Sequence, residues 1–386
     1  MKKLLIVLIV IFFTSGCFNY KELNDLGIVS AIGISKENDE FVIDVQLVNI
    51  IEAGKNGISE APISVISGKG KTIYEAAKSL NLKSSKLLFI SNIEYVLIDE
   101  SVIVEDIEEV LDYLTRDSRL SLSFLIVTSI DDKPKEIMSA LSQFDINSAS
   151  NLSNIIKLSE DRYGESYSLT IKDLLDEYLQ EGVSTVYPNI ALTGDYKELS
   201  ETDNLKTSDS DNYVSLKNLV FFTKDKEIVA LSKEEAFGYN FLVNHINNAT
   251  ITCECEGGYF SIQTLKSDFG YKDKLNNNEL DITGKIDGEI VYYGCNDDLS
   301  KQENINNVSK ITSDKIKDYV MKAIDKAISK KTDFIGIGKY IYKNNNKYFD
   351  FDNKDWDIEG LPNLKLNYNV KLNIVKQGNL RGDIHE

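Results

Sequence analysis

The residue whose position points most clearly to a chemical reaction is Cys17. It follows three small residues, 14–16, and an unbroken apolar run, 4–13, that begins after two lysines. This order is that of a secretory signal, and the run has about half of the ~20 residues that span a bilayer. In bacterial lipoproteins, a cysteine at this place receives a diacylglyceryl group and cleavage occurs before it. We therefore predict a lipoprotein signal peptide over 1–16 and lipidation at Cys17.

An ordinary signal peptide with an incidental cysteine is the alternative interpretation. The usual lipobox has leucine three residues before the cysteine, whereas this chain has Thr14. The Thr14 departure affects only how efficiently the lipid would be attached. If Cys17 is the anchor, everything after it is a soluble body held at a membrane surface.

Three short fragments imitate other motifs. Residues 70–72 end like a phosphate-binding loop, but Val65 stands where that loop needs glycine, and Thr72 fits better as a helix cap. Residues 268–270 spell Asp-Phe-Gly without the other kinase motifs. The acidic segment 350–355 lacks the glycine and glutamate of a calcium-binding EF-hand. We interpret all three as structural or surface residues.

The composition offers no positive argument for an enzyme or a cofactor. The sequence has two histidines, His245 and His385, but no Gly-x-Ser-x-Gly segment that would hold a catalytic serine. The cysteines do not have the spacing of a metal site. A pair among the 61 acidic residues could cleave a glycoside, which keeps a surface hydrolase as a third hypothesis. The formal net charge of −18 argues against binding nucleic acid or anionic lipid head groups.

The cysteines beyond Cys17 are Cys253, Cys255 and Cys295. Three cysteines cannot all pair within one chain. A disulfide from either Cys253 or Cys255 to Cys295 is possible outside the cytoplasm, and the spacing leaves both pairings open.

The 386 residues favour two or three domains, and the order of elements predicts an α+β fold with mixed or antiparallel sheets, each packed with helices. Strands and helices alternate over 17–194, which we predict to be an N-terminal α/β domain. The polar, acidic stretch 195–211 is the best candidate for a linker. It opens a small middle domain, 195–247, with a hairpin and a helix.

The last predicted domain, 248–386, combines an antiparallel sheet with the longest helix of the chain. Apolar residues recur at helical spacing over 312–329, so one face of this helix should cover a sheet. Apolar and polar residues alternate strictly over 365–374, the pattern of a strand with one buried face.

Two segments resemble the C subunits of spore germinant receptors, the Ger(x)C lipoprotein family. The first is 16–25, Gly-Cys-Phe-Asn-Tyr-Lys-Glu-Leu-Asn-Asp, followed by the small-residue strand 28–34. Family members often have tryptophan where this chain has Phe18. The second is 331–339, Lys-Thr-Asp-Phe-Ile-Gly-Ile-Gly-Lys, which follows the long helix and precedes a turn with Trp356.

The hairpin and helix over 219–242 also resemble the family, so the likeness covers essentially the whole chain. It implies three α/β domains outside the membrane, no catalysis, and assembly with two membrane-embedded partners, the A and B subunits. The complex lies in the inner membrane of the dormant spore and responds to nutrient germinants by triggering release of ions and dipicolinate. The lipid on Cys17 would hold this chain on the outer surface of that membrane.

From this resemblance we predict a non-enzymatic, lipid-anchored subunit of a nutrient germinant receptor. The alternative is a membrane-anchored solute-binding lipoprotein that delivers a small ligand to a transporter, which would need a deep cleft with convergent polar groups. Asp333, Gly336 and Gly338 are the candidate site residues of the second segment. The glycines should serve backbone geometry or close packing, and contact with a partner subunit is the alternative.

Overall fold

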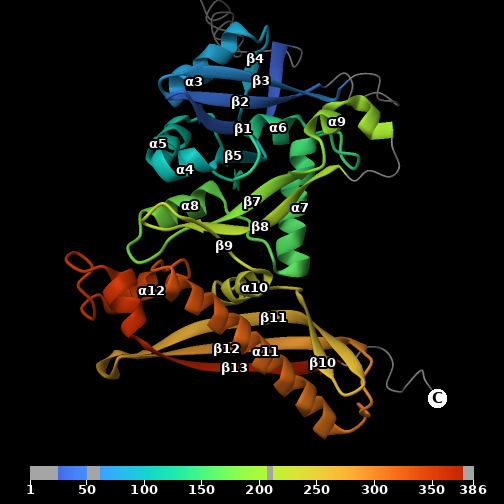
Figure 1. Cartoon of the computed structure of the whole chain (residues 1–386), viewed down its shortest axis with the longest axis vertical. Coiled ribbons are helices and arrows are strands. Elements are labelled where there is room, and N and C mark those ends of the chain that lie inside the picture. Colours follow the sequence, from blue (N-terminus) through green and yellow to red (C-terminus); the bar gives the residue numbers. More distant parts are fainter. Residues whose placement is uncertain (1–24, 50–60, 207–211, 377–386) are drawn as a thin grey trace, which may run out of the picture.

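The structure is a computed structural model that describes residues 25–49, 61–206 and 212–376. The predicted signal peptide, Cys17 and His385 lie outside these residues. Two sheets are stacked along the long axis of the molecule, with helix α10 between them (Figure 1). This arrangement of helices packed on mixed sheets confirms the predicted α+β fold class.

The first sheet has nine strands in the order β3-β2-β1-β5-β6-β7-β8-β9, with β4 paired to β1. Its strands are β1 (Leu26–Glu37), β2 (Glu40–Val48), β3 (Ile63–Gly70), β4 (Leu87–Phe89), β5 (Tyr95–Asp99), β6 (Leu125–Ser129), β7 (Val186–Thr193), β8 (Tyr213–Phe222) and β9 (Ile228–Ala230). The helices along it are α3 (Ile73–Ser79), α4 (Glu100–Glu105), α5 (Ile107–Arg116), α6 (Pro134–Ser139), α7 (Ser148–Tyr163), α8 (Ile171–Tyr178) and α9 (Tyr196–Ser200).

The second sheet has four strands in the order β10-β11-β12-β13. They are β10 (Thr250–Cys255), β11 (Gly258–Lys274), β12 (Glu279–Tyr293) and β13 (Lys365–Lys376), and the helices of this part are α10 (Lys233–Leu242), α11 (Gln302–Ser329) and α12 (Ile337–Asn345). Figure 1 shows α11 running diagonally across the sheet. Its predicted apolar face is buried, including Ile316, Val320, Ala323, Ile324 and Ala327.

Helix starts follow the capping signals of the sequence. The Thr170 and Ser232 hydroxyls accept backbone N–H bonds from Asp173 and Glu235, whose carboxylates accept the cap N–H groups in return. Both helices therefore begin with a capping box, which a serine or threonine followed three residues later by an acidic residue predicts. Thr72 caps α3 by accepting a backbone N–H bond from the third helical residue. Each cap satisfies a backbone donor that the helix itself leaves without a partner.

The last strand corrects the expectation of an antiparallel sheet over 248–386. β13 pairs with β12 in parallel, from Glu279 opposite Lys365 onward. A parallel neighbour requires a crossover connection, and α11 with α12 provides it by carrying the chain back along the sheet. Alternation over 365–374 predicts a strand with one buried face, but it contains no information about strand direction.

The expected linker 195–211 also differs from the structure in its described part. Residues 196–200 form α9 and residues 202–206 form a short 3₁₀-helix, and Leu199 is buried. The hairpin that follows extends the first sheet, because β8 pairs with β7 and β9 pairs with β8. Abundant acidic residues are typical of a linker, but the buried Leu199 packs this stretch against the rest of the protein. The division into three domains stays a prediction.

The structure decides between the two possible disulfides. Cys255 and Cys295 form a disulfide with Cα atoms 5.8 Å apart, whereas Cys253 is a free, buried thiol. Cys253 and Cys255 are two residues apart and face the same side of β10, so their position along the strand decides the pairing. Cys255 ends β10, next to the point where the Asn296 N–H donates to the Glu256 carbonyl at 2.9 Å and brings Cys295 alongside. Across the described ranges, no helix is both long and apolar enough to cross a bilayer.

Candidate functional site

Asp333, Gly336 and Gly338 lie at the tight turn that joins α11 to α12. Gly336 has a φ angle of 83°, in the left-handed region that glycine adopts without steric cost. It is the N-cap residue of α12, which begins at the next position. The turn therefore ends one helix and starts another within a few residues, as the glycine spacing predicts.

The Asp333 carboxylate is buried inside this turn and accepts N–H hydrogen bonds on both oxygens. Oδ1 accepts from the backbone of residues 335, 336 and 337 at 3.2, 2.7 and 3.2 Å. Oδ2 accepts from the Gly338 backbone at 2.7 Å and from the Trp356 indole at 2.8 Å. Since Gly336 has no side chain to cap α12, Asp333 supplies the acceptor that the helix start needs.

Burial raises the pKa of Asp333 to about 6, because a charged carboxylate loses its water shell there. The N–H donors of Gly338, Trp356 and Gly336 lower the pKa by stabilising the charged form, and the Asp357 carboxylate raises it. Above that pKa the group is a carboxylate held by N–H dipoles rather than by a partner cation.

The turn is tied to the first sheet through Asp357 and Lys224. Asp357 Oδ1 accepts from the Asp333 N–H at 2.7 Å, and Asp357 Oδ2 lies 2.8 Å from Lys224 Nζ. Lys224 belongs to the β8–β9 turn and also pairs with Asp355 at 2.7 Å. Just before β7, the Ser184 N–H donates to the Asp333 carbonyl at 2.8 Å. These contacts define the Asp333 joint, which connects the second sheet's helices to the first sheet.

Gly338 and Gly182 allow two backbone segments to touch at the Asp333 joint. The Lys339 N–H donates to the Gly182 carbonyl at 2.9 Å. A Cβ atom on Gly338 would lie 2.5 Å from Trp356 Nε1 and 2.7 Å from the Gly182 oxygen. A side chain at Gly338 therefore cannot enter without moving either the indole or the neighbouring backbone.

The structure thus gathers three of the predicted site residues in one buried joint, while Cys17 lies outside the described residues. The Asp333 side chain is fully buried and has hydrogen bonds to both oxygens, which favours a role in the turn over direct contact with a partner. Sequence reasoning missed Lys224 and Gly182, which reach the joint from distant elements. A lone lysine in a hairpin turn gives no signal of its partner more than a hundred residues away.

The fragment 70–72 and the histidine His245 have structural partners. Thr72 caps α3, and a Cβ on Gly70 would lie 2.5 Å from the Ala76 nitrogen, so helix packing occupies the space of a phosphate. His245 Nδ1 lies 2.5 Å from the Glu160 carboxylate. In the part of the chain that the structure describes, no cluster of histidine, cysteine or acidic residues could hold a metal ion.

Comparison with known proteins decides the family. The model "Spore germination protein N-terminal domain" matches residues 19–192, and "Spore germination B3/GerAC like, C-terminal" matches residues 217–378. The chain belongs to the GerAC-like family of spore germination proteins. The resemblance inferred from 16–34 and 331–339 is therefore confirmed.

Relatives match this GerAC-like chain over nearly its full length. Spore germination protein KC of Bacillus subtilis is 25% identical, over 94% of this chain and 92% of the relative. Spore germination protein GerQC of Bacillus cereus is 19% identical, over 98% and 99%. The crystal structure of the GerBC protein aligns with a TM-score of 0.54 at 13% identity, over 89% of this chain and 96% of that one, and it supports the fold.

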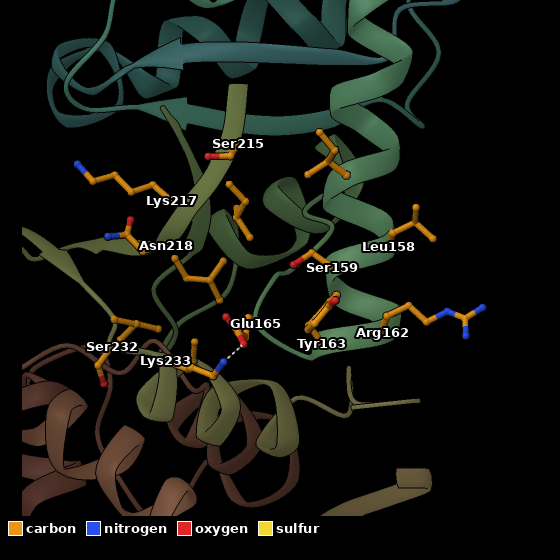
Figure 2. A pocket seen from close by; sticks show the side chains of 15 residues that line it. Leu158, Ser159, Arg162, Tyr163, Glu165, Ser215, Lys217, Asn218, Ser232 and Lys233 are labelled. Atoms are coloured by element: carbon orange, nitrogen blue, oxygen red, sulfur yellow. Dashed lines mark ion pairs between the residues drawn. The ribbon is translucent and has the colours of Figure 1, made fainter. Parts of the chain in front are cut away.

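A second notable feature of this GerAC-like protein is an open cavity of about 740 Å³ between α7, β8 and the start of α10. Leu158, Arg162 and Tyr163 of α7 are among the residues that line it, and Figure 2 shows the Leu158 and Arg162 side chains on the outer side of α7, away from β8. Glu165 and Lys233 form an ion pair at its lower end. Sequence patterns gave no indication of this space, since its walls come from segments far apart in the chain.

Glu177 on α8 is a half-buried carboxylate near the Asp333 joint. Burial raises its pKa to about 7, while the Thr185 hydroxyl and the charge of Lys339 act to lower it. The Tyr167 hydroxyl lies 3.4 Å from Glu177 Oε1. The folded protein therefore holds a proton on this group over a pH range in which the unfolded chain has released it.

Glu177→Gln should be more stable than the parent protein at pH 8 and equal to it near pH 4. Between about pH 4.5 and 7 the native state binds more protons at this site than the unfolded state, so the parent's free energy of unfolding falls as pH rises. A difference of about 1–2 kcal/mol at pH 8 is expected, because partial exposure reduces the full effect of the shift. Urea denaturation across this pH range measures it.

The exposed Glu181→Gln, four residues further on, is the control for loss of a surface charge. It should leave the pH profile unchanged. A Glu177→Gln profile that runs parallel to the parent at every pH would contradict the role assigned to burial.

Proposed function

We propose that this protein is a non-enzymatic subunit of a nutrient germinant receptor, anchored by a lipid on Cys17 to the outer surface of the spore inner membrane. The observation that carries the proposal is the match of both GerAC-like family models, over 19–192 and 217–378. The first match begins two residues after Cys17. In this role the chain assembles with the A and B membrane subunits of the receptor.

Physical features of the chain support an anchored, non-catalytic role. With a net charge of −18, the body has no general attraction to anionic head groups, so attachment must come from the lipid and from protein contacts. More than one acyl chain gives a stable anchor, where a single chain binds only reversibly. The buried Asp333 carboxylate has hydrogen bonds to both oxygens within the turn, so it is engaged in structure rather than open to a substrate.

Cys17→Ala is expected to move the protein from the membrane fraction of spores to the soluble fraction and to abolish germination by nutrients. The thiol is the only acceptor for the diacylglyceryl group, so its loss removes the anchor. Fractionation with immunoblotting, and optical-density loss after nutrient addition, measure the two effects. Cys253→Ala is the matched control, because it removes a thiol that forms no disulfide. A Cys17→Ala protein that stays membrane-bound and functional would overturn the anchoring proposal.

A further inference from the structure

The edge of strand β8 is open beside the cavity described above. β8 pairs with β7 along residues 213–221, but on its other side β9 pairs only with 220–222. Within the described residues, no strand pairs with 213–218 on that side, and the Leu219 carbonyl already accepts from the Leu231 N–H at 2.8 Å. An unpaired edge presents backbone N–H and C=O groups that a further strand can bind.

The cavity lies between α7 and β8, beside this edge of the sheet. Five consecutive residues, 215–219, line it, on both sides of the register shift at Lys217. A second cavity, of about 470 Å³, continues along 212–215 and shares Ile155 and Ser215 with the first. Together they form a groove, the β8 groove, with β8 as one wall and α7 as the other.

The β8 groove is apolar with a positive rim. Its apolar residues come from several elements and include Leu158, Leu216, Leu231, Phe144 and Val214. Three cations line the first cavity, Arg162, Lys217 and Lys233, against one carboxylate, Glu165. Arg162 and Lys217 are bound to Asp161 and Asp131 in exposed ion pairs, which are weak and can exchange for another carboxylate.

We propose that an extended segment of a partner protein adds to β8 as a further strand, with apolar side chains in the groove and at least one carboxylate beside Arg162 or Lys217. The backbone edge binds the extended main chain, and the groove selects the side chains. The open edge of about six residues accommodates a segment of similar length, roughly 20 Å. This proposal rests on the proposed function, since we take the partner to be a membrane subunit of the receptor.

A second copy of this chain does not fit the groove. Two chains that each have a net charge of −18 repel one another. β8 has Lys217 at a register shift opposite residues 189 and 190 of β7, and such an edge is a poor template for unselective pairing, so a bound segment must also contact the groove beside it. These features leave the edge available to a partner with the complementary charge.

Hydrogen exchange of the full chain, alone and in the complex purified from spore membranes with the A and B subunits, tests the proposal. Within 213–219, the amides that point away from β7 should exchange at least tenfold more slowly in the complex. Amides of β3, which pairs only with β2 at the opposite edge of the sheet, should be unchanged. A complex without protection of 213–219 would overturn this inference and leave the proposed function standing. Failure of the wild-type chain to co-purify would overturn both.

Variants at the groove give an independent measurement. Phe144→Asp and Arg162→Glu should each reduce co-purification of the membrane subunits at least tenfold. Leu82→Asp is the control, because Leu82 and Phe144 are both 89% exposed and Leu82 lies outside the groove. The proposed partner would be refuted if all three variants retained the membrane subunits equally. It would also be refuted if protection of 213–219 from hydrogen exchange depended on the concentration of this chain alone.

Discussion

Asp333→Ala should lower the free energy of unfolding by about 4 kcal/mol, because buried N–H groups that lose their acceptor cost about 1–3 kcal/mol each. Asp333 accepts from four backbone N–H groups and the Trp356 indole. Water that enters the space left by the carboxylate recovers part of the loss, so the total is below a simple sum. The midpoint and slope of urea denaturation measure the change.

Asp333→Asn separates charge from shape at the same position. The amide keeps one acceptor oxygen, but its NH₂ group would face N–H donors, so a loss of about 2–3 kcal/mol is expected. The exposed Asp352→Ala in the nearby loop should change stability by less than ~0.5 kcal/mol. An Asp333→Ala protein as stable as this control would show that the Asp333 joint contributes little to the fold.

Gly238→Ala should cost about 3 kcal/mol, although alanine is the better helix former. Gly238 lies where α10 crosses α11, and a Cβ there would be 2.0 Å from the Tyr319 carbonyl oxygen. Because that atom is backbone, the two helices must separate, and overpacking of this kind costs about 1–3 kcal/mol or more. The gain of about 1 kcal/mol in helix propensity does not offset it. Thermal and urea denaturation provide the measurement.

The control for this variant is Gly270→Ala in β11, where an added Cβ would meet nothing within 4 Å. It should be neutral or slightly stabilising, since alanine also restricts the unfolded chain. If the two alanine variants had equal stability, the close approach of α10 and α11 would not be a constraint on the fold.

Local features of the fold were predictable from sequence, because they depend on residues close together in the chain. The capping boxes at Thr170 and Ser232 and the buried stripe of α11 depend on neighbours three or four residues away. The direction of β13 and the union of the β8–β9 hairpin with the first sheet depend on partners far away. Periodicity shows which side of a strand is buried, and it does not identify the neighbouring strand.

The candidate site also has a part that the sequence predicts and a part that it does not. The glycine spacing after α11 identified the turn, and the resemblance drew attention to Asp333. The Trp356 indole that binds Asp333 follows it by 23 residues, and Lys224 comes from the other sheet, so neither contact has a local signature. The β8 groove is formed by the absence of a strand neighbour, and a single sequence cannot indicate that absence.

The parallel pairing of β12 with β13 fixes the order in which this protein can fold. Each residue pair in that ladder is about 86 residues apart, whereas β10 and β11 pair across a turn of two residues. Contacts between distant residues form slowly, because a long loop must close before they stabilise anything. The β10–β12 meander can form during synthesis, but its last edge stays open until Lys365–Lys376 arrives. In that interval the edge of β12 is exposed and can pair with a wrong strand. A chaperone would therefore have its greatest effect at this step.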